Sequence, residues 1–217
     1  MYTVRTRTRV KVCGITRVED ALACAQAGVD AIGLVFYAPS PRNVVIKQAQ
    51  EIVSALPPFI TTVGLVVNAS PAELHNICAQ VELDVIQFHG DETPVFCAEN
   101  SPKPWIKALA MHQSLEVEQA AYDYMKAGAQ GILLDAYVEG VRGGTGKAFD
   151  WERFPQTQDI PYILAGGLNP QNVKTAITRT NPWAIDLSSG VEIQPGVKNH
   201  QAIQELVSQT YIGATGV

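Results

Sequence analysis

Residues 10–36 read VKVCGITRVEDALACAQAGVDAIGLVF, and this stretch decides the fold. It opens with a short run rich in Val, continues with apolar residues spaced three and four apart, and closes with a second apolar run. Runs that are apolar on both faces are typical of parallel strands covered by helices. The segment between them has the period of an amphipathic helix. The stretch therefore predicts a strand, a helix and a second strand parallel to the first.

The turn after the first run separates the two folds built from such units. A doubly wound open sheet normally carries a GxGxxG turn there, because those glycines let the backbone approach a dinucleotide. In this chain the turn is CGITRVED, at residues 13–20. The turn favours a closed barrel over an open sheet.

The same alternation continues along the whole chain. Eight apolar runs occur at 10–15, 31–36, 62–67, 85–90, 105–111, 131–137, 162–168 and 184–190. Most segments between them have helical period, and the shortest is DWERF at residues 150–154. Helix start and stop signals stand at Ser70-Pro71, Asn169-Pro170, Gly28 and Gly128. Eight βα units in 217 residues predict one α/β domain over residues 1–217, a single (β/α)8 TIM barrel.

Composition restricts the class of protein and its partners. With 47% hydrophobic and 17% charged residues, the chain can bury a large core, which excludes a disordered protein. A net charge of −5 gives no general attraction to nucleic acid or to anionic lipid, so neither is expected as a partner. An anionic ligand must therefore be held by local groups.

Cysteine usage and hydropathy predict the compartment. The four cysteines form no CxxC pair and no close Cys/His cluster, so we expect free thiols and no metal site. No apolar run approaches the roughly 18 residues of a membrane helix. The N-terminus lacks the apolar core of a secretory signal. The predicted location is the cytoplasm.

A barrel carries its active site at the carboxyl ends of its strands, where Cys13 and Asp135 stand. Their strands lie three steps apart around an eight-stranded ring, so we expect the two side chains to face each other. A thiolate and a carboxylic acid are a base and an acid for moving a proton along a substrate. The alternative for Cys13 is a small buried hydrophobic residue.

Small residues follow the last two strands. They are Gly166, Gly167, Ser188, Ser189 and Gly190. Barrels often bind phosphate at these two loops through backbone N–H groups, and serine hydroxyls add neutral donors. The alternative is that the glycines only form tight turns.

Three further positions have a binding interpretation and an ordinary one. Arg42 follows a Pro-stiffened turn and suits a carboxylate, although a solvated arginine is common. Residues 141–147, which include Gly144, predict a lid that excludes water. Their GGTGK is no P-loop, because Ala148 follows the lysine. His89 is a candidate base, and a hydrogen-bonded histidine at the rim is the favoured interpretation.

Taken together, the motifs resemble those of the phosphoribosylanthranilate isomerases. The matching stretches are VKVCGIT at 10–16, GLVFYAPSPRNV at 33–44, VGLVVN at 63–68, QFHGDE at 87–92, LLDAY at 133–137, GGTGKAFDW at 143–151, LAGGLNPQNV at 164–173 and DLSSGVEIQPGVKN at 186–199. They run in order along nearly the whole chain. The departures Phe88 and Ala148 touch no catalytic position.

The resemblance implies a ribulose-phosphate-binding barrel of tryptophan biosynthesis. It would catalyse an Amadori rearrangement of a phosphosugar, with Asp135 as general acid and Cys13 as general base. Arg42 would bind the anthranilate carboxylate, and the two glycine and serine loops would bind phosphate. The family uses no cofactor, and its barrels are monomers or homodimers. Related phosphate-binding barrels need either a catalytic lysine or an Asp base at the end of the first strand, where this chain has Cys13, so Cys13 argues against them. A non-catalytic phosphosugar-binding barrel would lack Cys13 or Asp135, and both are present.

One expectation comes from strand geometry alone. Lys11 lies two residues before Cys13, so both side chains share a face of the first strand and point into the barrel. Asp186 lies on the eighth strand, which closes the ring beside the first. We predict a buried Lys11–Asp186 pair that places positive charge beneath Cys13. The alternative is a lysine that reaches solvent.

Overall fold

Eight parallel strands form a closed barrel in the computed structural model, which describes residues 7–112, 116–136, 151–157 and 159–211. Each strand pairs with the next in the chain, and β8 pairs with β1. The strands are β1 Arg9–Cys13, β2 Ala31–Phe36, β3 Thr61–Val66, β4 Val85–Phe88, β5 Trp105–Met111, β6 Ile132–Ala136, β7 Tyr162–Leu164 and β8 Ala184–Leu187. The predicted (β/α)8 barrel is confirmed.

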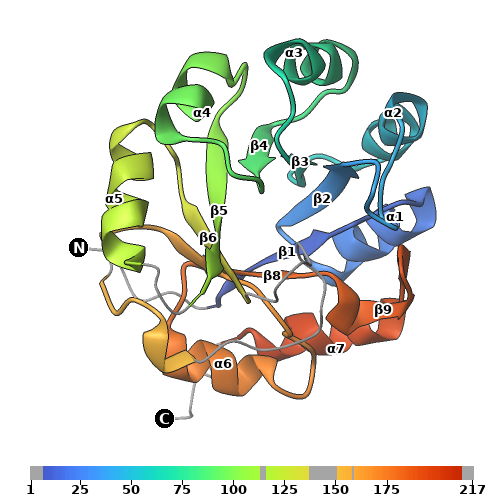
Figure 1. Ribbon diagram of the computed structural model, residues 1–217. Helices are drawn as coiled ribbons and strands as arrows, with labels where there is room; N and C mark the ends of the chain where they lie inside the picture. The colour runs from blue at the N-terminus through green and yellow to red at the C-terminus, as the bar shows by residue number, and fades with distance from the viewer. Residues whose placement is uncertain (1–6, 113–115, 137–150, 158, 212–217) are drawn as a thin grey trace.

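Helices surround the ring of strands, as Figure 1 shows. They are α1 Val18–Ala27, α2 Ile46–Ser54, α3 Pro71–Gln80, α4 Pro94–Asn100, α5 Val117–Lys126, α6 Val173–Thr180 and α7 His200–Gln209. The main hydrophobic core lies between these helices and the outer faces of the strands. Within the described residues, none of the helices combines the length and the apolar character needed to cross a bilayer.

Three of the predicted helix signals work as expected; one of them is Gly128, which follows the end of α5 with a φ of 109°. The Ser70 hydroxyl accepts a hydrogen bond from the backbone of Glu73, whose carboxylate accepts one from the backbone of Ser70, so a capping box starts α3 at Pro71. Gly28 ends α1 with a φ of 83°, a left-handed conformation that favours glycine. Local sequence fixes these ends because the chemistry that stops or starts the helix is itself local.

Two other expectations are wrong. Asn169-Pro170 does not start a helix, because the Asn169 side chain accepts from the backbone N–H of Gln171 and Asn172 and forms a turn; α6 begins only at Val173. In the segment DWERF, of which residues 151–154 are described, Trp151–Arg153 form a 3₁₀ turn in place of an amphipathic helix. Five residues are too few for a stable α-helix, and the shorter repeat of a 3₁₀ turn suits them.

A hairpin that the apolar runs did not predict follows β8. A short 3₁₀ turn at Ser189–Val191 leads into β9, Glu192–Gln194, and β10, Val197–Lys198. Pro195 and Gly196 form the turn between these strands, and the φ of Gly196 is 80°. The Thr16 hydroxyl donates to the Gly196 carbonyl. The hairpin is therefore tied to the loop after β1, at the mouth of the barrel.

Candidate active site

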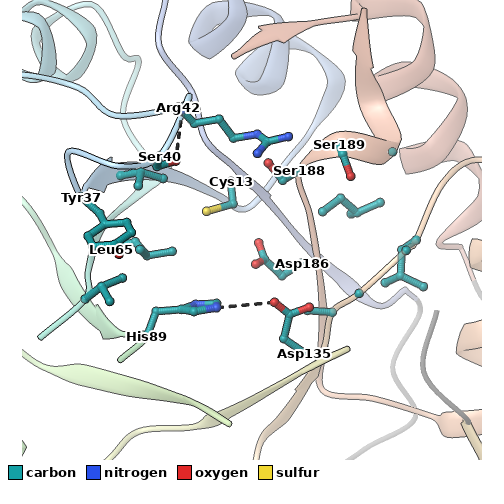
Figure 2. A pocket seen from close by; sticks show the side chains of 18 residues that line it. Cys13, Tyr37, Ser40, Arg42, Leu65, His89, Asp135, Asp186, Ser188 and Ser189 are labelled. Carbon is teal, nitrogen blue, oxygen red and sulfur yellow. Dashed lines mark hydrogen bonds and ion pairs between the residues drawn. The ribbon is translucent and has the colours of Figure 1, made fainter. Parts of the chain in front are cut away.

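One pocket at the carboxyl ends of the strands brings together most of the predicted site residues. Its lining includes Cys13, Arg42, His89, Asp135, Gly166, Gly167, Asp186, Ser188, Ser189 and Gly190. Figure 2 shows Cys13 and Arg42 on one side of this pocket and His89 and Asp135 on another. Gly144 and the predicted lid at 141–147 lie outside the described residues. Within the part that is described, no cluster of three His, Cys, Asp or Glu side chains is suited to hold a metal ion.

Lys11 and Asp186 form the predicted buried pair. They are register partners in the β1–β8 ladder, and Lys11 Nζ lies 2.9 Å from Asp186 Oδ1. Both side chains are less than 10% exposed. Burial acts against the charged lysine, but Asp186 and Cys13 together raise the pKa of Lys11 above its usual value. The floor of the pocket therefore holds a charged ammonium group.

Gly33 creates the space in which this ammonium group and the thiol of Cys13 meet. It pairs with Cys13 in the β1–β2 ladder. A Cβ at residue 33 would lie 2.7 Å from Cys13 Sγ and 3.0 Å from Lys11 Nζ, which is too close for the sulfur. A glycine is therefore needed on β2 for close packing rather than for backbone freedom, and sequence reasoning missed this role.

The ionisation of Cys13 is set by two opposing influences. The thiol is 6% exposed, and burial raises its pKa. The ammonium groups of Lys11 and Lys198 favour the thiolate and lower the pKa in part, whereas Asp186 raises it. Because the pKa ends above its usual value, the pocket without substrate holds Cys13 mainly as a neutral thiol at neutral pH.

His89 lies between two polar side chains, those of Gln87 on β4 and Asp135 on β6. The amide nitrogen of Gln87 lies 2.8 Å from His89 Nδ1. His89 Nε2 lies 3.5 Å from Asp135 Oδ2 (Figure 2). If this amide nitrogen donates to Nδ1, the proton of a singly protonated ring lies on Nε2, which faces Asp135. These contacts favour the interpretation of His89 as a hydrogen-bonded rim residue.

The loops after β7 and β8 contact each other directly. Gly166 and Gly167 have φ values of 86° and 66°, which favour glycine. A Cβ at Gly190 would lie 1.8 Å from the carbonyl oxygen of Leu168, so only glycine fits there. Besides making turns, these glycines let two loops close on one end of the pocket, where Ser188 and Ser189 add hydroxyl groups.

Arg42 is held by a residue that sequence reasoning missed. Its Nε lies 2.9 Å from Glu192 Oε1, and its Nη2 lies 2.7 Å from Glu192 Oε2. A paired guanidinium has a fixed direction, which suits recognition of a planar carboxylate. Arg42 is thus not the solvated arginine of the ordinary interpretation; its side chain is 13% exposed.

Comparison with known proteins identifies relatives over nearly the full length. A family model described as N-(5'phosphoribosyl)anthranilate (PRA) isomerase matches residues 10–209. The N-(5'-phosphoribosyl)anthranilate isomerase of Pseudomonas fluorescens (strain Pf0-1) is 54% identical over 200 residues, covering 92% of this chain and 97% of that protein. The Alcanivorax borkumensis protein of the same name is 49% identical, with coverages of 96% and 98%.

Solved structures agree in fold. The phosphoribosyl anthranilate isomerase of Thermotoga maritima matches with a TM-score of 0.85 and 37% identity, covering 94% of this chain and 98% of that one. A second such structure is in complex with reduced 1-(o-carboxyphenylamino)-1-deoxyribulose 5-phosphate. It matches with a TM-score of 0.78 and 36% identity over the same shares of the two chains.

Proposed function

The chain belongs to the N-(5'-phosphoribosyl)anthranilate isomerase family, and we propose that it carries out the Amadori rearrangement of tryptophan biosynthesis. The substrate is N-(5-phosphoribosyl)anthranilate and the product is 1-(2-carboxyphenylamino)-1-deoxyribulose 5-phosphate. The observation that carries the proposal is that Cys13, Asp135, Arg42 and the two glycine and serine loops line a single pocket. That pocket offers a base, an acid, a carboxylate partner and a phosphate cradle to one molecule.

Proton transfers at two atoms of the sugar make up the reaction. Asp135 gives a proton to the furanose ring oxygen, and the C1–O bond breaks as the substrate nitrogen supplies its electron pair to form a Schiff base. The Cys13 thiolate then removes the proton from C2, and the electrons of that bond return to nitrogen in an enolamine. Tautomerisation to the ketone completes the rearrangement. Lys11, buried beside Cys13, favours the thiolate that the second step requires.

The remaining pocket groups position the substrate. Arg42 binds the anthranilate carboxylate from its fixed pairing with Glu192. The phosphate is bound by backbone and hydroxyl donors at Gly166, Gly167, Ser188, Ser189 and Gly190. His89 directs its Nε2 proton toward Asp135 and the bound sugar. Gly144, which lies outside the described residues, is proposed as a further substrate contact.

The partner we propose is this small phosphosugar alone, met in the cytoplasm. The chain acts as a monomer or as a homodimer, and a solved relative from Thermotoga maritima is described as dimeric. Light scattering of the purified protein distinguishes these two states.

The first test measures the reaction itself. Purified protein is added to N-(5-phosphoribosyl)anthranilate, and the fluorescence of the anthranilate group is followed as the sugar rearranges. We expect the signal to fall at a rate proportional to enzyme concentration. A protein that binds the compound without consuming it would be a phosphosugar-binding barrel, and the enzymatic proposal would be wrong.

A second prediction concerns Lys11. In Lys11→Met, the thiol of Cys13 loses a neighbouring positive charge, so its pKa rises further and less thiolate is present at neutral pH. We expect kcat near neutral pH to fall by roughly tenfold, as removal of a charge from a partly desolvated site implies. The loss should shrink as the pH is raised. Ultraviolet absorbance of the thiolate measures the ionisation of Cys13 as the pH is raised. The same titration of the Cys13→Ser protein gives the signal of the other three cysteines, which is subtracted.

Asp186→Asn is the matched control for Lys11→Met. Asp186 raises the pKa of Cys13, so its removal should move thiol ionisation to lower pH, opposite to the Lys11 variant. Both variants break the same buried pair. If the two titrations move in the same direction, the pair acts through packing and the electrostatic explanation is wrong.

A further inference from the structure

Lys198 is a buried lysine to which the mechanism above assigns no part. Lys198 is on β10, and its side chain is 0% exposed. Its Nζ donates to the Cys13 carbonyl at 2.6 Å, to Glu192 Oε1 at 2.7 Å and to the Ser188 carbonyl at 3.2 Å. An ammonium group has three donors and no acceptor. Three acceptors therefore satisfy it completely, and one of them is a carboxylate.

Glu192 lies between the two cations, Arg42 and Lys198. Its Oε1 accepts from Arg42 Nε and Lys198 Nζ, and its Oε2 accepts from Arg42 Nη2. Its side chain is only 4% exposed. Burial opposes ionisation, yet Arg42 and Lys198 together hold the pKa of Glu192 below its usual value. Glu192 is therefore a buried carboxylate anion.

The charges of Arg42, Glu192 and Lys198 together set the net charge beside a ligand bound at Arg42. Arg42 and Glu192 alone form a neutral pair, and a substrate carboxylate placed beside it would meet a buried anion as well as a cation. Lys198 adds a second positive charge, and its Nζ binds Glu192 Oε1, the oxygen that also accepts from Arg42 Nε. Burial lowers the pKa of Lys198, and the charge and hydrogen bond of Glu192 oppose this shift. With Lys198 protonated, the cluster carries a net charge of +1, which matches one carboxylate.

Neighbouring charges do not cancel this balance. Asp20 accepts a hydrogen bond from the backbone N–H of Lys198, but Arg17 pairs with that carboxylate through two hydrogen bonds. His200 lies 2.8 Å from its other oxygen. The charge of Asp20 is thus balanced by Arg17, and the charge of Lys198 balances that of Glu192.

We propose that Lys198 is a positioning residue that determines specificity for a carboxylate-bearing substrate, because it neutralises Glu192 and leaves the charge of Arg42 to the ligand. In the described part of the chain, Arg42 Nη1 makes no hydrogen bond to a protein acceptor, and Arg42 lines the pocket. Glu192 fixes the direction of the Arg42 guanidinium, and Lys198 balances the negative charge of Glu192. The inference rests on the proposed function, in which Arg42 binds the anthranilate carboxylate.

The test compares two ligands that differ only in the carboxyl group. One is reduced 1-(o-carboxyphenylamino)-1-deoxyribulose 5-phosphate, the compound bound in a solved relative, and the other is its phenylamino counterpart. Equilibrium binding gives the ratio of their Kd values for each protein. We expect Lys198→Met to reduce the preference for the carboxylate ligand by roughly tenfold to a hundredfold, the range for a charge-assisted hydrogen bond.

A double variant separates charge from packing. Glu192→Gln combined with Lys198→Met removes one charge of each sign, so the cluster again carries +1 and most of the preference should return. Both proteins leave the carbonyls of Cys13 and Ser188 without their lysine donor, so the double variant is a matched control for that loss. Lys198→Gln retains a donor for these carbonyls and provides a second neutral variant if Lys198→Met does not fold.

The outcomes distinguish this inference from the proposed function. If wild type turns over N-(5-phosphoribosyl)anthranilate and prefers the carboxylate ligand, but both neutral variants keep that preference, the role of Lys198 is wrong and the enzymatic function stands. A double variant no better than the single one also overturns it, because packing then explains the loss. If wild type neither turns over the substrate nor prefers the carboxylate ligand, the proposed function itself fails.

Discussion

Replacing Cys13 with Ser should lower kcat for N-(5-phosphoribosyl)anthranilate by roughly a hundred- to ten-thousandfold, the usual cost of losing a positioned base. A serine hydroxyl is close to a thiol in size but is a far poorer source of an anion at neutral pH. Cys13 is 6% exposed and lies over the buried Lys11–Asp186 pair, so the change removes the ionisable group and little packing. We therefore expect the KM to change much less than kcat.

The same reaction should depend on pH through this thiol. Burial raises the pKa of Cys13, and the proposed mechanism uses its thiolate as the base, so the wild-type rate should increase as the pH rises toward that pKa. The residual activity of Cys13→Ser should lack this rise. The fluorescence assay measures both profiles. Cys78→Ser, which changes a half-buried thiol on α3 outside the pocket, is the control and should match wild type.

If Cys13→Ser keeps the wild-type rate, Cys13 is the small buried hydrophobic residue of the alternative interpretation. The base would then have to be another group in the pocket, and Asp186 is the nearest carboxylate to the same face of β1. Such a result would leave the family assignment intact, because that assignment rests on similarity along the whole chain.

The barrel could be predicted from the sequence because its strands are buried on both faces. Each strand then appears as an unbroken apolar run, and the runs at 31–36 and 105–111 coincide with β2 and β5 residue for residue. The buried pair of Lys11 and Asp186 was predictable for a related reason. Side chains alternate along a strand with period two, and closing the ring makes β8 the neighbour of β1.

Other features depend on contacts that no local pattern encodes. Arg42 and Glu192 are 150 residues apart, and the pairing forms only because the hairpin after β8 folds back over the mouth of β1. Gly33 looks like any small residue in a strand, and its role depends on the side chains that point at it from β1. Sequence reasoning therefore predicted which strand ends line the pocket, but not the residues that contact Arg42 and Cys13.

Asp135→Asn should cost as much as the loss of Cys13, because the amide has nearly the shape of the acid but no proton to give to the ring oxygen. We expect kcat to fall by roughly a hundred- to ten-thousandfold with a small change in KM. Asp135 is 9% exposed and faces His89 at 3.5 Å. An asparagine retains an oxygen for that contact, so the pocket should keep its structure.

Deuterium at C2 of the ribose distinguishes the roles of the two residues. In the proposed mechanism Cys13 removes this hydrogen as a proton, so in Cys13→Ser that step should become slower and the isotope effect on kcat should be fully expressed. In the same proposal Asp135 acts earlier, at ring opening, where the C2–H bond stays intact. In Asp135→Asn ring opening limits the rate, and the isotope effect should therefore be smaller than in wild type. A smaller isotope effect in Cys13→Ser and a larger one in Asp135→Asn would mean that Asp135 is the base and Cys13 the acid. Equal isotope effects in the two variants would contradict the assignment of the two residues to different steps.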